Sequence, residues 1–273
     1  MSAVAGAIGI ARPHLSAMRN RPPPRQRGRP PLPDAELVAD IRALVAELPT
    51  YGYRRVHALL RRQAQETGRA APNPKRVYRI MKVHGLLLQP HNGKGEERRH
   101  DGRVAVDHRN TRWCSGALEI ACDNGEKVRV AFTLDCCDRE AMGHVATTGS
   151  ITAEDVQDLM VATVEHQYGA VNRLPEPIEW LSDNGSCYTA REIGLIPRNT
   201  PVSSPQSNGI AEAFVRTLKR DYVRVSPRPN TRTVIEQLPG WLAHYNHVHP
   251  HRALGYRSPR EYIAQTREAP SGL

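Results

Sequence analysis

The sequence predicts an α/β protein in which a mixed β-sheet flanked by helices is preceded by a small all-helical module. Two observations predict this order. Apolar residues recur at helical spacing between residues 34 and 87, and after residue 112 the pattern changes to short β-type runs separated by turns. The 273 residues, 39% of them hydrophobic, are enough for one large domain or two small ones with packed cores.

The charge of the chain is unevenly distributed. Residues 1–112 hold 22 basic and 9 acidic residues, a net of +13, whereas residues 113–273 hold 16 and 19, a net of −3. A strongly basic N-terminal part indicates a polyanionic partner such as nucleic acid. An arginine-rich solvated surface without a partner is the alternative explanation of the charge taken alone.

Features of membrane and secreted proteins are absent from the sequence. No stretch approaches the ~20 continuous apolar residues that a membrane span needs, and the N-terminus does not follow the pattern of a signal peptide. The five cysteines form no CxxC pair and are odd in number. This argues against a disulfide scaffold or a zinc ribbon and favours the reducing cytoplasm.

Residues 1–33 read as a poorly ordered N-terminal segment with a Pro/Arg-rich linker, and residues 34–87 as a module of three helices. The first helix begins at Asp34 and the second covers about 54–65. The third begins at Asn73-Pro74, an N-cap followed by proline at the first helical position, and ends at Gly85. Residues 88–112 are polar, rich in turn formers and predicted to be a second linker.

The third helix has a basic face. At 100° per residue its basic side chains lie largely opposite Val77, Ile80 and Met81. Three short helices whose last is basic on one face are typical of a helix-turn-helix module with its DNA recognition helix. An ordinary amphipathic surface helix is the alternative. The predicted DNA-binding residues of this helix are Lys75, Arg76, Arg79 and Lys82.

Residues 113–265 are predicted to form the sheet domain, closed by a C-terminal helix and tail. Two strands, 111–122 and 127–135, are joined by a hairpin turn containing Asn124-Gly125, the strongest short hairpin signal. A strand at 141–149, a helix at about 152–167 and a buried strand at 178–183 follow. A short helix at 190–197, a strand at 199–204 and helices at 208–222 and 232–246 complete an order found in RNase H-like domains.

Two carboxylates have positions suited to phosphodiester chemistry. Asp183 ends the strand 178–183, and Glu212 lies near the start of a helix that also carries Arg216, Lys219 and Arg220, which we expect to face DNA. Mg²⁺ prefers carboxylate oxygens, and two such ions can activate the attacking hydroxyl and neutralise the leaving oxygen. Taken alone, an Asp at a strand end is more often a turn residue than a ligand, and a Glu in a first helical turn is usually a helix-dipole partner.

Five segments, the most specific being SPQSNGIAEAFVRTLKRDY and HYNHVHPHRALGYRSPREY, resemble the second-frame (OrfB-type) transposase of two-frame bacterial insertion sequences, in the retroviral-integrase superfamily. The others are YGYRRVHALL, NPKRVYRIM and IEWLSDNGSCY. The resemblance implies an RNase H-like integrase core with an Asp-Asp-Glu triad, Mg²⁺ or Mn²⁺ as cofactor, and cleavage and joining of DNA. It also implies double-stranded DNA (element ends and target) as partner, a homo-oligomer on DNA, no membrane, and the bacterial nucleoid as location. By position, Asp183 matches the second Asp and Glu212 the Glu.

Two departures from the family predict impaired catalysis. The first strand should read Trp-x-x-Asp, but here Trp113 is followed by Cys114, Ser115 and Gly116, so glycine stands at the first ligand position. Asp135 is the least unsuitable substitute. Asp183 and Glu212 are separated by 28 residues (212 − 183 − 1), about seven fewer than in the family, or about 10 Å of helix. The metal would then be bound weakly, if at all.

Three functions remain open from the sequence. The first is a catalytically impaired insertion-sequence transposase, and the second is a non-catalytic DNA-binding remnant that occupies element ends or inhibits active transposase. A free-standing RNase H-like nuclease is the weakest, because the C-terminal segment belongs with transposases. The histidines between 244 and 251 suggest zinc, but they fit better as part of that segment near the active site.

Overall fold

A computed structural model describes residues 9, 11, 13–14, 33–89, 105–171, 173–182, 195–199 and 209–268. The chain divides into two compact units, Met1–Glu36 and Leu37–Leu273. Nearly all described elements belong to the second unit, which holds both the helical module and the sheet. In the described part, no helix has the length and apolarity needed to cross a bilayer.

The helical module consists of α3 (Ala35–Glu47), α4 (Tyr53–Glu66) and α5 (Pro74–Val83). Their apolar faces meet in one cluster that includes Ile41, Val56 and Val77, each fully buried. α5 begins as the sequence predicts, since the Asn73 side chain accepts a hydrogen bond from the backbone N–H of Lys75 at 2.8 Å. The three-helix module is therefore confirmed.

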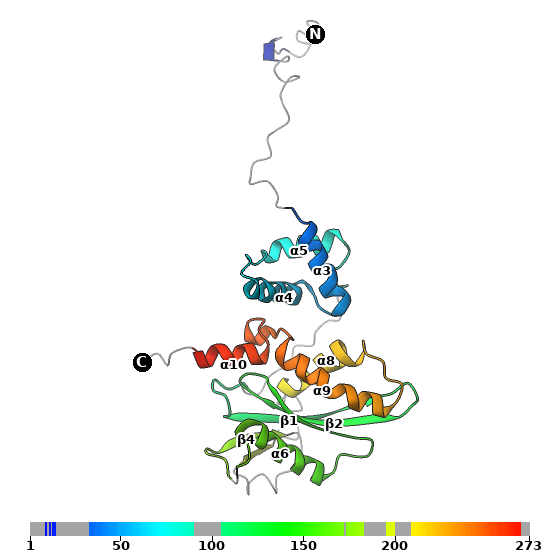
Figure 1. Cartoon of the computed structure of the whole chain (residues 1–273), viewed down its shortest axis with the longest axis vertical. Coiled ribbons are helices and arrows are strands. Elements are labelled where there is room, and N and C mark those ends of the chain that lie inside the picture. Colours follow the sequence, from blue (N-terminus) through cyan, green and yellow to red (C-terminus); the bar gives the residue numbers. More distant parts are fainter. Residues whose placement is uncertain are drawn as a thin grey trace. The chain divides into compact units, whose positions relative to one another are not determined.

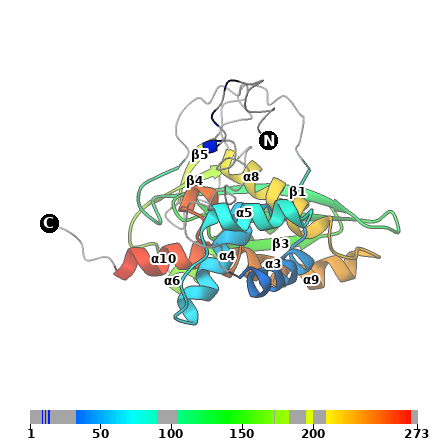
Figure 2. The same cartoon turned by 90° about the horizontal axis from the view of Figure 1, so that it is seen from above.

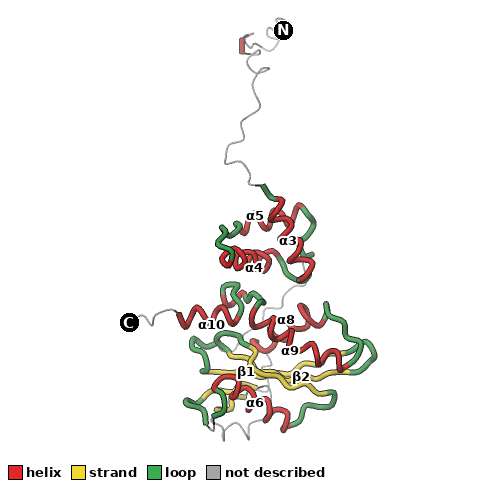
Figure 3. Tube along the Cα trace, viewed as in Figure 1, coloured by secondary structure: helices red, strands yellow, loops and turns green. Residues whose placement is uncertain are grey.

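The sheet has five strands in the order β3-β2-β1-β4-β5. Its strands are yellow in Figure 3. β1 (Arg112–Ala121), β2 (Lys127–Asp135) and β3 (Ala141–Thr147) are antiparallel neighbours. β4 (Ile178–Ser182) runs parallel to β1, and β5 (Leu195–Asn199) runs parallel to β4. The sheet is thus mixed, as the element order predicts.

Helices cover both faces of the sheet (Figures 1 and 2). α6 (Ala153–Tyr168) packs on β3 and β2 on one face, and α8 (Gly209–Leu218) and α9 (Thr231–His247) pack on the other. The core between the sheet and α8 and α9 is apolar and includes Leu118, Phe132, Phe214 and Leu238. The chain then forms a 3-10 turn η3 (Arg252–Leu254) and α10 (Pro259–Glu268).

Two details differ from the sequence prediction. Residues 195–197, expected at the end of a short helix, are in β5, which pairs with β4 from Ile178↔Leu195 to Ser182↔Asn199. Only 12 residues (195 − 182 − 1) separate these parallel strands, about the minimum for a crossover. The prediction of a strand at 199–204 is therefore wrong in its boundaries, because the edge of β4 takes up the earlier segment. Residues 190–194 and 200–204 lie outside the described residues.

The second difference is at the end of the helix that carries Glu212. The sequence predicts one helix over 208–222, but α8 ends at Leu218 and continues as a π-helical turn η2 (Lys219–Val223). Such turns occur often at functional sites. Here η2 buries Asp221, Tyr222 and Val223, so an aspartate that sequence analysis does not single out faces inward.

Candidate active site

Gly116 lies in the central strand of the sheet. It pairs with Phe132 across β1 and β2, and its neighbour Cys114 pairs with Leu181 across β1 and β4. The strand that contains Gly116 and the strand that leads to Asp183 are therefore adjacent and parallel, as expected for two ligand-bearing strands. Asp183 itself lies outside the described residues.

The side of Gly116 that would carry a side chain faces α8. A Cβ atom built there would lie 2.9 Å from Cζ of Phe132 and 3.2 Å from Cβ of Ala211. Ala211 immediately precedes Glu212 in the first turn of α8. A residue at position 116 would thus point toward the turn that holds Glu212, which is the arrangement expected of the missing aspartate.

The space beside Gly116 is tightly packed. The Phe132 ring is 1% exposed and packs against Phe214, with ring centroids 4.5 Å apart. Phe214 in turn meets the Tyr245 ring edge-on at 4.8 Å. A side chain at position 116 therefore displaces the Phe132 ring, which aromatic neighbours support from behind.

Among the described residues, no carboxylate close to Gly116 takes the place of the first ligand that the family resemblance implies. On the same face of β1, Cys114, Leu118 and Ile120 are buried in the apolar core. Asp135 is buried opposite Trp113, and burial raises the pKa of its carboxyl group. Its oxygens accept backbone N–H groups at 2.7 Å from Cys137, 3.3 Å from Asp138 and 2.8 Å from Asn110. Asp135 thus fixes the turn between β2 and β3.

The described residues do not fit a two-metal centre. In that part of the chain, no three His, Cys, Asp or Glu side chains are grouped so that they could hold a metal ion. Of the three expected ligand positions, one is a glycine, Asp183 is not described, and Glu212 is half-buried in the first turn of α8. Glu212 is therefore the one expected ligand whose place the structure gives.

The predicted DNA-binding residues lie on two helices. On α5, Lys75, Arg79 and Lys82 are exposed and Arg76 is half-buried. Val83, at the end of the same helix, is 71% exposed. These basic side chains share the surface of the helix that lies opposite its buried apolar residues.

The basic residues after Glu212 do not all have the same surroundings. Arg216 and Lys219 are exposed. Arg220 forms two hydrogen bonds to the buried Asp221, both 2.6 Å long. The Arg220 guanidinium is therefore hydrogen-bonded within the protein, and the predicted contact of Arg220 with DNA stays a prediction.

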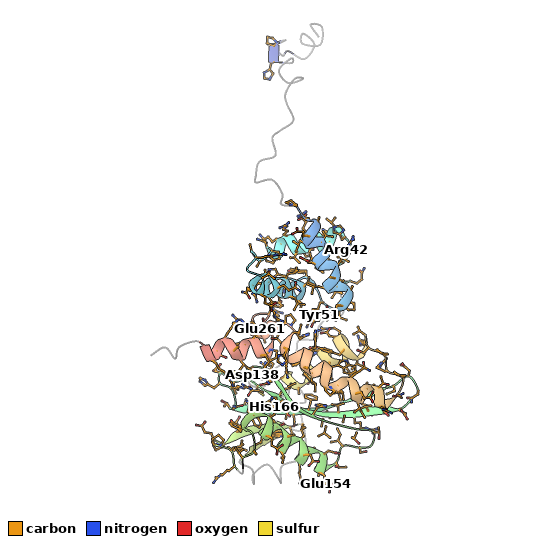
Figure 4. All side chains as sticks on the ribbon, viewed as in Figure 1. Arg42, Tyr51, Asp138, Glu154, His166 and Glu261 are labelled. Atoms are coloured by element: carbon orange, nitrogen blue, oxygen red, sulfur yellow. The ribbon has the colours of Figure 1, made fainter. Side chains whose placement is uncertain are left out.

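Asp221 also joins the helical module to the sheet domain. Arg55 of α4 donates to its Oδ2 at 2.9 Å, although the two residues are 166 positions apart. Two further contacts join α4 and its N-terminal flank to the C-terminal segment: Tyr51 donates to Nδ1 of His249 at 2.6 Å, and Arg62 pairs with Glu261. Figure 4 labels Tyr51 and Glu261. The helical module is thus docked on the turn that follows the Glu212 helix.

His244, His249 and His251 are packed in the domain, and His247 is exposed. His244 Nδ1 lies 2.9 Å from the Tyr222 hydroxyl, and His251 meets the Tyr245 ring edge-on at 4.6 Å. Burial holds the pKa of His249 well below its usual value, so this ring is neutral at pH 7, and its Nδ1 is hydrogen-bonded to the Tyr51 hydroxyl. These contacts favour the interpretation of this segment as part of the domain.

Comparison with known proteins agrees with this arrangement. An HTH-like domain family matches residues 32–94, and an integrase core domain family matches residues 194–259. The transposase InsD for insertion element IS2A/D/F/H/I/K of Escherichia coli is 54% identical over 241 residues, which cover 85% of this chain and 79% of InsD. The InsD transposase for insertion element IS2-9 of E. coli K12 is equally identical, with 78% of its length covered.

Solved structures resemble the chain more distantly. The intasome of simian T-cell lymphotropic virus with a PP2A regulatory subunit matches 82% of this chain and 73% of its own, at 14% identity and a TM-score of 0.48. The Mos1 transposase catalytic domain with raltegravir and Mg matches 59% and 79%, at 13% identity and a TM-score of 0.41.

The fold and the positions of Gly116 and Glu212 define a protein with a helix-turn-helix-like module and an integrase-type core. The sequence identity to InsD identifies the family more specifically than the fold does. The chain belongs to the family of insertion-element transposases that includes InsD of IS2.

Proposed function

We propose that this chain is an insertion-element transposase that binds double-stranded DNA at element ends but whose own catalytic centre is incomplete. The observation that carries the proposal is the place of Gly116. It lies in β1 beside β4, facing the first turn of α8, at the position where the first carboxylate of the triad is expected.

The chemistry proposed for the intact family is strand cleavage and transfer with divalent metal ions, which activate the attacking oxygen and stabilise the leaving one. In this chain Asp183 and Glu212 are the proposed ligands of such an ion. Glycine offers no oxygen from a side chain, and the neighbouring Cys114 and Leu118 are buried in the core. Hard cations prefer oxygen ligands, so a site without the first carboxylate holds them weakly.

The DNA-binding part of the proposal rests on charge and exposure. α5 begins with its own cap, carries four basic residues along one side, and belongs to a segment with a net charge of +13. Phosphate contacts supply most of the affinity of such a surface, and they release counterions. A chain that binds ends without cutting them would occupy them, or join homo-oligomers of active transposase and inhibit them.

The experiment is to measure binding of a fluorescent element-end duplex by anisotropy over a range of NaCl concentrations. We compare the unmodified chain with Lys75→Ala/Arg76→Ala/Arg79→Ala/Lys82→Ala. Each phosphate contact contributes about 0.9 to the slope of log K against log salt. We expect the quadruple variant to lose about two to four units of slope and at least about a hundredfold in affinity.

A matched control removes four exposed arginines elsewhere, Arg69, Arg173, Arg232 and Arg267, and so changes the net charge equally. Circular dichroism shows that each variant remains folded. An α5 variant that binds DNA as the control does, with the same salt slope, would contradict the docking of α5 on DNA. Failure of the unmodified chain to bind any duplex would contradict the proposed function as a whole.

A further inference from the structure

A cavity of about 320 Å³ opens beside the first turn of the Glu212 helix. Its wall includes Gly209 and Ile210 at the start of α8, Arg139 from the turn between β2 and β3, and His251 and Arg252 from the segment after α9. Arg55 of α4 also reaches it. Three arginines, two histidines (His249 and His251) and a helix N-terminus thus line one cavity.

Arg139 is held in place by an unusual backbone conformation. Its φ is +67°, in the left-handed region that non-glycine residues rarely adopt. The turn is fixed by Asp135, whose carboxylate accepts the backbone N–H groups of Cys137 and Asp138 and whose carbonyl accepts that of Arg139 at 3.0 Å. Strained conformations of this kind persist where the surrounding structure enforces them, and they cluster at functional sites.

Two of the three guanidinium groups have no carboxylate to neutralise them. Within the described ranges, neither Arg139 nor Arg252 forms an ion pair, whereas Arg55 is paired with Asp221. Asp221 is also held by Arg220 at 2.6 Å, so the nearest buried carboxylate is already balanced by two cations. The cavity therefore has an excess of positive charge.

His251 supplies an unsatisfied polar atom in the wall. Its Nε2 is buried and makes no hydrogen bond with any described residue. Burial, followed by the charge of Arg55, lowers the pKa of His251 to about 3, so the ring is neutral at pH 7, and its hydrogen bond to the Tyr245 backbone places its one proton on Nδ1. Nε2 therefore carries a lone pair, and His251 lines the cavity without donating a hydrogen bond into it.

The N-terminus of α8 adds to the positive electrostatic potential of the cavity. α8 is 10 residues long, and its first residues, Gly209 and Ile210, line the cavity. The helix dipole at such an end favours an anion. The excess of positive charge and the helix end therefore both favour an anion.

We propose that this cavity binds a backbone phosphate of DNA, with Arg139 and Arg252 as its ligands. The inference rests on the proposed function, because it takes the anion to be a phosphodiester of the bound duplex. A phosphate held here lies beside the turn that carries Glu212, and so it would fix the path of the strand past that residue. Free inorganic phosphate presents the same oxygens and is the competing source.

The test compares the unmodified chain with Arg139→Asn/Arg252→Gln, in the same anisotropy titration against salt. Asparagine tolerates the left-handed backbone of position 139 and removes the charge. We expect about tenfold weaker binding and a salt slope smaller by about one, as for one lost phosphate. The control Arg232→Gln/Arg267→Gln removes two exposed charges and should leave the slope unchanged.

A second variant changes the cavity wall without changing its charge. His251→Phe keeps an aromatic ring against Tyr245 and removes no donor from the cavity, so it should leave the DNA affinity and the salt slope unchanged. Calorimetric titration with inorganic phosphate is the second arm. Tight binding of inorganic phosphate with DNA affinity unaltered by Arg139→Asn/Arg252→Gln would overturn the assignment to DNA.

The two proposals fail in different ways. If the unmodified chain binds duplex DNA and the α5 variant loses that binding, but Arg139→Asn/Arg252→Gln behaves as its control, then the cavity proposal alone is wrong. If no duplex is bound by the unmodified chain, the proposed function is wrong, and the cavity proposal fails with it.

Discussion

Replacing Gly116 by alanine tests the packing at the position of the missing aspartate. The added Cβ would lie 2.9 Å from Cζ of Phe132 and 3.2 Å from Cβ of Ala211, and ordinary contacts begin at 3.4 Å. The Phe132 ring must therefore move by roughly 0.5 Å against Phe214, whose ring centroid is 4.5 Å away. Overpacking of this kind costs about 1–3 kcal/mol, and alanine recovers about 0.5–1 kcal/mol of chain entropy.

The expected result for Gly116→Ala is a free energy of unfolding lower by about 0.5–2 kcal/mol, measured by urea denaturation. Gly240→Ala is the control, because a Cβ at that position of α9 meets nothing within 4 Å. It should stabilise the chain by about 0.5–1 kcal/mol. Pairing Gly116→Ala with Phe132→Leu should recover part of the loss, as a double-mutant cycle detects.

A stabilising effect of Gly116→Ala would contradict this packing. If Gly116→Ala stabilised the chain as much as Gly240→Ala does, then position 116 would be open rather than packed against α8. The interpretation of Gly116 as facing the Glu212 turn would then be refuted.

Three further predictions concern buried titratable side chains. Asp221→Asn should lower the free energy of unfolding by about 2–4 kcal/mol, because Arg55 and Arg220 lose the carboxylate that they share. The loss is limited because both arginines stay partly exposed to water. A loss under about 0.5 kcal/mol would contradict the role of Asp221 in docking α4. Burial lowers the pKa of His249 and His251, so below about pH 6.5 only the unfolded chain binds protons at these two side chains. The free energy of unfolding should therefore fall with pH by about 1.4 kcal/mol per pH unit for each histidine. In urea titrations at several pH values, His251→Phe should remove one of these two contributions. Burial and the charge of Asp135 raise the pKa of Asp138 to about 7, so this carboxyl should destabilise the fold as pH rises from about 4 to about 7, and Asp138→Asn should flatten that part of the profile.

Local chemistry made much of the fold predictable. Asn73 and Pro74 fixed the start of α5, Asn124-Gly125 fixed the β1–β2 turn, and Thr152 with Asp155 forms the capping box at the start of α6. Each of these signals acts within a few residues of the chain. The interpretation of Gly116 came instead from the resemblance to the transposase family, whose first strand reads Trp-x-x-Asp.

Contacts distant in sequence were not predictable from such signals. β5 was placed too late, because its position depends on pairing with β4 rather than on its own pattern. The π-helical turn after α8 turns Asp221 inward to meet Arg55, and nothing in the local sequence indicates a partner 166 positions away. The cavity likewise joins segments distant in sequence, with Arg139 between β2 and β3, Gly209 in α8, and His251 and Arg252 after α9.

Strand transfer on labelled element-end DNA, in Mg²⁺ or Mn²⁺, tests the central claim most directly. Three proteins are compared: the unmodified chain, Gly116→Asp, and Gly116→Asp with about seven residues reinserted between Arg191 and Leu195, nearly two helical turns. The aspartate restores an oxygen ligand, but ligands must be held within about 0.5 Å of the productive geometry, and the short connection to β5 remains. We expect DNA binding without cleavage in the unmodified chain, tighter metal binding in the single variant, and full strand transfer only in the third protein. Robust strand transfer by the unmodified chain would contradict the claim that its catalytic centre is incomplete.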